Sequence, residues 1–438
     1  MVNVGWSQTN LDDALFGGNQ ESSQEESSQE DTDTAAGDDD LFQGGGSFIS
    51  DVEEDPDANP ADDLLTSETV TIGGSIDMSA EFQVLLNPDD DQDTVDSGLV
   101  DLNARFFLDA RPDSDFRALV KGDIIYSTED DLEFDLREAF ADVDIDNIVF
   151  IRAGKQTINW GVGVFFSPAN LINIERIDPE DTSAELAGPV AIKAQLPLGV
   201  NNLTGYLLTD DFESDDNIGI AGLYEFLFEG YEITVGSVYR YDAPWAVMAT
   251  ATGELADVTV YGEAVLEGNS DKVFLTEDAT GLDASTSDDV FFSGTLGARF
   301  TTSTEDDRYT LSAGAQYFFN GQGYGDTSIF TDNPAAVSGL VADGTLSISD
   351  LTERGKHYAA LSLSSPDVNF SDITPSVFWL GNLSDGSGFA TATARYEITD
   401  DLSTSLQYRF NYGAEGAEYS PRGDSHSITL SLDFFGSF

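Results

Sequence analysis

Apolar and polar residues alternate along the last part of the chain. Ile428, Leu430, Leu432 and Phe434 occupy even positions, and serine, threonine or aspartate fills the odd positions between them. A period of two predicts a β-strand with one apolar face. An edge strand of a soluble β-sandwich has the same pattern, so this strand alone does not decide the fold class.

The same alternation recurs through most of the sequence. The runs are roughly ten residues long, which is enough for a tilted strand to cross a bilayer. No apolar run approaches the roughly twenty residues of a transmembrane helix. We count eighteen candidate strands, at residues 69–86, 99–111, 115–127, 131–144, 147–159, 189–198, 202–209, 217–228, 230–242, 244–254, 257–268, 290–302, 307–320, 355–365, 373–381, 387–398, 401–413 and 424–438.

The connections between these strands are sorted by length. Short turns follow even-numbered strands, whereas the long connections all follow odd-numbered strands, at 87–98, 160–188, 269–289, 321–354 and 414–423. Outer-membrane barrels have short periplasmic turns and long external loops, but a sandwich has no reason for such sorting. We therefore predict an all-β, transmembrane, antiparallel up-and-down β-barrel at residues 66–438. It has about eighteen strands, or sixteen if two weaker strands near 189–228 do not form.

The final residue, Phe438, adds to this prediction. A C-terminal strand that ends on phenylalanine resembles the signal by which the barrel assembly machinery recognises outer-membrane barrels. We expect a location in the bacterial outer membrane, with outer-membrane lipid as partner and both ends of the chain in the periplasm. Residues 1–20 lack the basic and apolar regions of a secretory signal, so we expect the sequence to be a mature form.

Residues 1–65 differ from the rest. They contain eighteen acidic residues and no lysine or arginine, a composition that favours a disordered tail. A short pattern recurs within it, as Asp12–Gly18 and Asp39–Gly45. It is either a low-complexity coincidence or a pair of docking peptides for a periplasmic partner.

The formal net charge of −64 has several candidate causes. Acidic clusters in the connections could attract cations to a pore mouth, could bind divalent cations outside, or could reflect adaptation to salt. We favour salt adaptation, because the excess extends into the tail. Such a chain is a poor partner for nucleic acid.

Charged side chains and one glutamine also occur on the strand faces opposite the apolar stripes. A lysine or arginine on the lipid face costs about 2–4 kcal/mol near the midplane, so we expect these residues to line a pore. They are Arg105, Arg117, Lys121, Arg137, Arg152, Gln156, Arg240, Arg299, Arg395, Arg409, Asp109, Asp123, Glu225 and Glu263. They could brace the wall by pairing with each other, filter polar solutes, or do both.

Three adjacent segments carry a family resemblance. Leu136–Asp142 reads LREAFAD, Arg152–Gly161 reads RAGKQTINWG, and Ser167–Asn173 reads SPANLIN. Together they resemble a motif pair of a large group of porin-like outer-membrane β-barrels, over about forty residues. The resemblance implies a passive channel or an exporter-like pore, and no enzymatic activity.

The connection after this motif is long and partly apolar. An apolar external segment is better buried than exposed, so we expect it to fold into the lumen as a constriction. The candidate residues are Trp160, Phe165, Phe166, Pro168 and Asn170. Trp160 could instead belong to an aromatic girdle at the membrane boundary.

Little in the sequence supports catalysis. The two histidines are His357 and His426, and Ser425 and Ser427 point to the opposite strand face from His426. With no cysteine and no metal-binding spacing, we expect no catalytic residues, metal site or cofactor. The sequence predicts a porin-like channel for small hydrophilic solutes. The alternative is a structural or adhesion barrel whose long external loops bind a partner.

Overall fold

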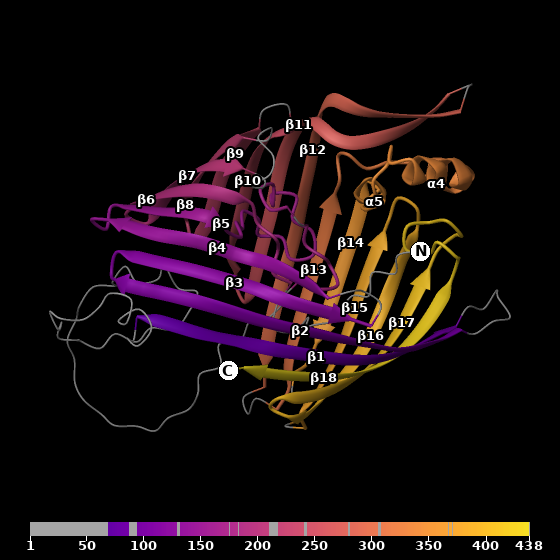
Figure 1. Ribbon diagram of the computed structural model, residues 1–438. Helices are drawn as coiled ribbons and strands as arrows, with labels where there is room; N and C mark the ends of the chain where they lie inside the picture. Colours follow the sequence, from indigo (N-terminus) through magenta and orange to yellow (C-terminus); the bar gives the residue numbers. More distant parts are fainter. Residues whose placement is uncertain are drawn as a thin grey trace.

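One antiparallel sheet closes on itself to form a ring of eighteen strands (Figure 1). The computed structural model describes residues 69–86, 94–128, 132–174, 176–182, 184–209, 218–240, 243–278, 281–304, 308–366, 368–369 and 371–437. Each strand pairs with its neighbour in sequence, and β1 also pairs with β18, from Ser75–Ser437 to Leu86–His426. The expected acidic tail, its two repeated motifs and Phe438 lie outside the described residues.

The ring contains all eighteen strands that the alternation predicts. They are β1 (Val70–Leu86), β2 (Thr94–Asp113), β3 (Phe116–Ser127), β4 (Glu133–Ile145), β5 (Val149–Lys155), β6 (Val190–Leu198), β7 (Asn201–Thr209), β8 (Gly219–Phe228), β9 (Tyr231–Arg240), β10 (Trp245–Leu255), β11 (Val258–Asp278), β12 (Gly281–Ser303), β13 (Thr310–Phe319), β14 (His357–Ser364), β15 (Ile373–Asn382), β16 (Ser387–Thr399), β17 (Leu402–Tyr412) and β18 (Ser425–Ser437). The weaker strands near 189–228 form β6 to β8, so the count is eighteen and not sixteen.

The two faces of the ring are inverted relative to a soluble protein. In β18, Ser427 and Thr429 are 4% and 5% exposed, whereas Ile428 and Leu430 are 41% and 50% exposed. Exposed leucine, isoleucine and valine side chains recur on the same face of the other strands. An outward apolar face and an inward polar face suit a closed sheet surrounded by lipid, and they exclude the β-sandwich.

The connections are sorted as the sequence predicts. The segments that follow odd-numbered strands include 156–189, 320–356 and 413–424, whereas two-residue turns join several even-numbered strands to the next strand. Three short helices occupy the second of these segments: α3 (Ser328–Asp332), α4 (Pro334–Ala342) and α5 (Ile348–Leu351). None of the helices in the described ranges is long and apolar enough to span a membrane.

Several strand boundaries differ from the sequence prediction; β2, for example, begins at Thr94 and not near residue 99. The segment 269–289 was expected to be a loop, but β11 continues to Asp278 and β12 begins at Gly281, so it forms a hairpin that projects beyond the ring (Figure 1). Leu275 packs in this hairpin against Phe330 and Leu346, which gives the projecting strands an apolar core of their own. In contrast, β5 ends at Lys155 and not near residue 159.

This architecture predicts a specific behaviour of the purified protein. In detergent, the far-UV circular dichroism spectrum should be dominated by β-structure, and unheated protein should migrate differently from boiled protein on a gel, because the closed ring resists unfolding. A mainly helical spectrum, or identical mobility before and after boiling, would contradict the barrel.

Candidate functional site

The connection between β5 and β6, residues 156–189, lies inside the ring; we call it the inward loop. Its side chains reach strands distributed around the whole barrel, which is possible only from the interior. The contacts pair Glu185 with Lys121 of β3, Trp160 with Tyr206 of β7, Phe166 with Phe318 of β13, Phe165 with Phe378 of β15, and Glu180 with Arg409 of β17.

Glu263 of β11 anchors the inward loop to the wall. One carboxylate oxygen accepts hydrogen bonds from the backbone N–H groups of Val162 and Gly163, both at 2.6 Å. The other accepts from the N–H of Ala169 at 2.9 Å, and Ser167 Oγ donates to the same carboxylate at 3.0 Å. The loop backbone therefore encloses the carboxylate of a side chain that is only 5% exposed.

Gln316 of β13 provides a second anchor next to the first. Its Oε1 accepts hydrogen bonds from the N–H groups of Val164 and Phe165, at 3.1 and 2.8 Å. Its Nε2 donates to the carbonyl oxygen of Phe166 and to Thr295 Oγ1. Glu263 and Gln316 together bond one backbone group in each of six residues between 162 and 169, and backbone groups inside a folded protein need such partners.

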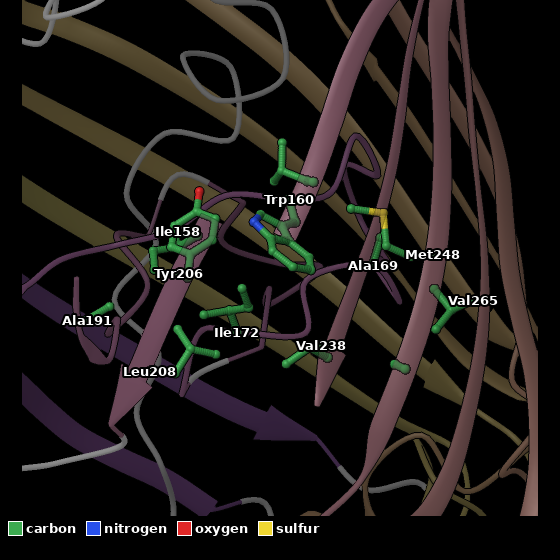
Figure 2. Close-up of a cluster of buried hydrophobic side chains, with 12 residues drawn as sticks. Ile158, Trp160, Ala169, Ile172, Ala191, Tyr206, Leu208, Val238, Met248 and Val265 are labelled. Carbon is green, nitrogen blue, oxygen red and sulfur yellow. The ribbon is translucent and has the colours of Figure 1, made fainter. Parts of the chain in front are cut away.

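Two apolar clusters hold the inward loop on either side of these anchors. Trp160, Ala169 and Ile172 pack among the inward side chains of β6, β7 and β9 to β11 (Figure 2). Phe165 and Phe166 are 1% and 2% exposed, and they pack against aromatic residues of β13 to β16. Trp160 is buried in the first cluster, so the girdle interpretation of this residue is wrong.

The inner faces of β2 to β4 carry an ion-pair network around Asp123. The Asp123 side chain is fully buried and lies between two arginines: Arg105 Nε at 2.9 Å and Arg137 Nε at 3.0 Å. Glu185 of the inward loop adds a further partner for Arg105, at 3.6 Å, and for Lys121. The inward loop is thereby attached to this side of the wall by charge as well as by hydrogen bonds.

A second network follows the same strands toward the short turns. Asp109 pairs with Arg111 and Arg117, each at 3.1 Å, and Asp142 pairs with Arg152 at 2.7 Å. The guanidinium group of Arg152 also lies 3.8 Å from the ring centre of Phe140, within the distance of a cation–π interaction. In both networks the arginines keep 11–40% of their side chains exposed.

A β-bulge determines which side chains of the LREAFAD segment point into the ring. The β3–β4 register shifts between the pairs Lys121–Glu138 and Gly122–Leu136, so the extra residue on β4 is Arg137. A bulge reverses the alternation beyond it. Arg137 contacts Asp123, while beyond the bulge Phe140 and Asp142 contact Arg152. Strict parity would not place both parts of the motif on the inner face.

The next strand meets this segment at an unusually close distance. Gly154 of β5 has φ +135°, and a Cβ there would lie 2.1 Å from the carbonyl oxygen of Ala139. A glycine is therefore required at this position of the RAGKQ segment. Two residues later, Gln156 donates from Nε2 to the carbonyl oxygen of Ala191 at 3.1 Å, so its side chain fastens the start of the inward loop to β6.

The other sequence-predicted residues lie apart from these networks. Arg409 pairs with Glu180 of the inward loop and lies 3.8 Å from the ring centre of Phe389. Glu225 of β8 accepts a hydrogen bond from Asn202 Nδ2 at 3.0 Å. Arg299 of β12 and Arg395 of β16 are half-buried. Asn170 accepts a hydrogen bond from Asn173 within the inward loop, at 2.8 Å.

A cavity of about 270 Å³ separates the inward loop from the inner faces of β9 to β13. Pro168 and Asn170 line it from the loop side, and Arg240 lines it from β9. Its other charged groups are Arg176, Lys272, Glu267, Asp271 and Glu353. Arg176 pairs with Glu353 at 3.2 Å, and Gln322 donates to Glu267 at 2.7 Å. The cavity therefore presents both signs of charge.

Comparisons with known proteins give structural matches alone. No protein-family model and no curated protein matches the sequence. Among solved structures, OccAB1 of Acinetobacter baumannii has a TM-score of 0.48 and 11% identity, covering 84% of this chain and 97% of that one. OccK11 (OpdR) of Pseudomonas aeruginosa has a TM-score of 0.49 and 10% identity, covering 85% and 97%. The structure of OpdK from the same organism with vanillate has a TM-score of 0.47 and 9% identity, and the match covers 84% of this chain and 99% of that one.

Proposed function

We propose that this protein is an outer-membrane channel for the passive diffusion of small hydrophilic solutes. The observation that carries the proposal is the inward loop, which contacts strands around the ring from the inside and leaves a charged cavity beside it. The arginine-rich wall of β2 to β5 would then form the opposite side of the path, with Arg105, Arg117, Arg137 and Arg152 in contact with the solute.

The chemistry of the interior supports hydrophilic solutes. The inner face carries charged, amide and hydroxyl side chains, and the apolar side chains that it also carries on β6 to β11 and β13 to β16 pack with those of the inward loop. A solute that passes therefore meets ion pairs with partly exposed arginines. A lumen for fatty acids would need an apolar path instead.

Planar-bilayer recording of refolded protein tests this function. We expect stepwise increases in conductance when the protein is added to one side of the bilayer. In a separate liposome-swelling assay, larger sugars should permeate more slowly than smaller ones. A protein that inserts, shown by its heat-dependent gel mobility, but adds no conductance steps would overturn the channel and favour a closed structural barrel.

The projecting hairpin supports a second candidate function, in which the barrel anchors a binding surface. The distal parts of β11 and β12 and the helices α3 to α5 share an apolar core of Leu275, Phe330 and Leu346. Such a unit can keep its shape outside the membrane. If the interior proves closed to solutes, binding of intact cells to other surfaces through this unit becomes the better proposal.

The orientation that we propose follows from the lengths of the connections, because the long ones lie at one end of the barrel and the short turns at the other. We propose that the long connections are external and the short turns periplasmic, which would place both chain ends in the periplasm. The C-terminal strand would then be available to the barrel assembly machinery, and the acidic residues 1–65 to a periplasmic partner.

A further inference from the structure

We propose that Glu418 is a proton-operated latch, which holds the β17–β18 connection against the inner wall in acid and releases it at alkaline pH. This connection, residues 413–424, folds over the start of β14, the end of β15 and the start of β16, which lie next to one another. Glu418 Oε2 accepts hydrogen bonds from Tyr358 Oη and from Asn382 Nδ2, both at 2.7 Å. These two side chains belong to adjacent strands, so a single carboxyl group joins the connection to the wall.

Further contacts between the connection and its surroundings lie close to this carboxyl group. The N–H of Glu418 donates to Asp385 at 3.0 Å, and the N–H of Tyr419 donates to Ser387 Oγ at 3.2 Å. Tyr419 also packs edge-on against Phe389, with ring centres 5.5 Å apart. Arg354 Nη2 donates to the carbonyl oxygen of Gly416 at 2.7 Å. Apart from the Tyr419 ring, these contacts use backbone groups of the connection, namely the N–H groups of Glu418 and Tyr419 and the carbonyl oxygen of Gly416.

The charges near Glu418 are mainly negative. Asp385 lies in the β15–β16 turn, Glu353 in the connection before β14, and Glu180 in the inward loop, and all three act on the neighbouring Tyr419. The cations are Arg354, which lies 4.0 Å from Asp385, and Lys272 of β11. Burial raises the pKa of Glu418 to about 7, against the lowering effects of Tyr358, Arg354 and Asn382, and Asp385 raises it further.

The sign of the pH dependence follows from this shift. When the connection detaches, Glu418 returns to water and to a pKa near 4.5. A carboxyl group whose pKa is higher in the attached state binds its proton more tightly there, so protonation favours attachment. Attachment is therefore strongest below about pH 4.5 and weakens as the pH rises toward 7. The full shift corresponds to a change on the order of 10²-fold in the attachment equilibrium.

Thiol labelling measures this equilibrium directly, because the chain contains no cysteine. Ala417 is 3% exposed when the connection is attached, whereas Ala414 is exposed in the same segment. We expect the labelling rate of Ala417→Cys, divided by that of Ala414→Cys, to rise at least tenfold between pH 5.5 and 8.5. The division removes the intrinsic effect of pH on thiol reactivity. A constant ratio would overturn the latch.

Substitutions then identify the titrating group. Glu418→Gln imitates the protonated form, so it should keep the ratio low at all pH values. Glu415→Gln removes an exposed carboxylate of the same segment and should leave the response intact. Asp385→Asn should move the midpoint to lower pH, because a charge that opposes ionisation is lost. A normal response in Glu418→Gln would refute the proposal. The labelling does not require conduction, so its outcome is independent of the channel function.

Discussion

Replacing Glu263 and Gln316 together by alanine is expected to increase the single-channel conductance severalfold. The two side chains accept backbone hydrogen bonds from residues 162–165 and 169 of the inward loop. A hydrogen bond to a charged group contributes about 1.5–3 kcal/mol, and Glu263 accepts four such bonds. Without both anchors, the central part of the inward loop loses its polar attachment to β11 and β13 and no longer narrows the ring.

A single variant should show how much Glu263 contributes. Glu263→Gln keeps an acceptor but also introduces a donor among three backbone N–H groups. It should therefore increase the conductance less than the double alanine variant does, and its currents should be noisier. The matched control is Asn202→Ala with Glu225→Ala, which removes an amide and a carboxylate that pair with each other on the inner wall. If the anchor variant inserts normally yet conducts like the parent protein, the inward loop does not set the size of the path.

The triple variant Arg105→Ser, Arg117→Ser and Arg152→Ser is expected to shift ion selectivity strongly toward cations. Each of these arginines neutralises a buried or partly buried aspartate: Asp123, Asp109 or Asp142. Their removal leaves those carboxylates facing the lumen with fewer partners. Reversal potentials under a salt gradient measure the change, and the parent protein should show at most a mild cation preference.

Salt concentration provides an internal check on this effect. The screening length falls from about 30 Å at 0.01 M salt to about 3 Å at 1 M, so the difference between the triple variant and the parent should shrink as salt rises. Arg308→Ser is a suitable control because this exposed arginine lies in the turn between β12 and β13. Equal reversal potentials for the triple variant and the parent at low salt would show that the three arginines do not face the permeating ions.

Alternation and connection length were enough to predict the strands of the barrel. The period of two is enforced by the two solvents of a transmembrane strand, and Ile428 to Phe434 show it as clearly in the structure as in the sequence. The exceptions have local causes. The distal half of the β11–β12 hairpin projects beyond the ring, where Leu275 packs against Phe330 and Leu346, so its alternation no longer has to match that of the ring.

The candidate site was harder to predict, because it depends on pairs of residues that are far apart in the chain. Sequence parity places Glu263 on the inner face, but nothing near residue 263 indicates that its partner is the backbone of residues 162–169. Gln316 was not a candidate at all, since a single glutamine in an alternating strand carries no distinctive signal. Phe140 was also missed: the bulge at Arg137 that moves it inward leaves no mark in the alternation of the LREAFAD segment.

The anchoring of the inward loop imposes an order on assembly. Glu263 follows Val162 by 101 residues, and Gln316 follows Phe165 by 151. If hairpins form in order from the N-terminus, the β5–β6 hairpin exists while the anchors on β11 and β13 are still unpaired. Phe165 and Phe166 then have no aromatic neighbours and remain exposed to water. In this order, the segment lacks its wall partners until more than two-thirds of the strands have paired, and the last seam, between β1 and β18, closes around a loop that is already in place.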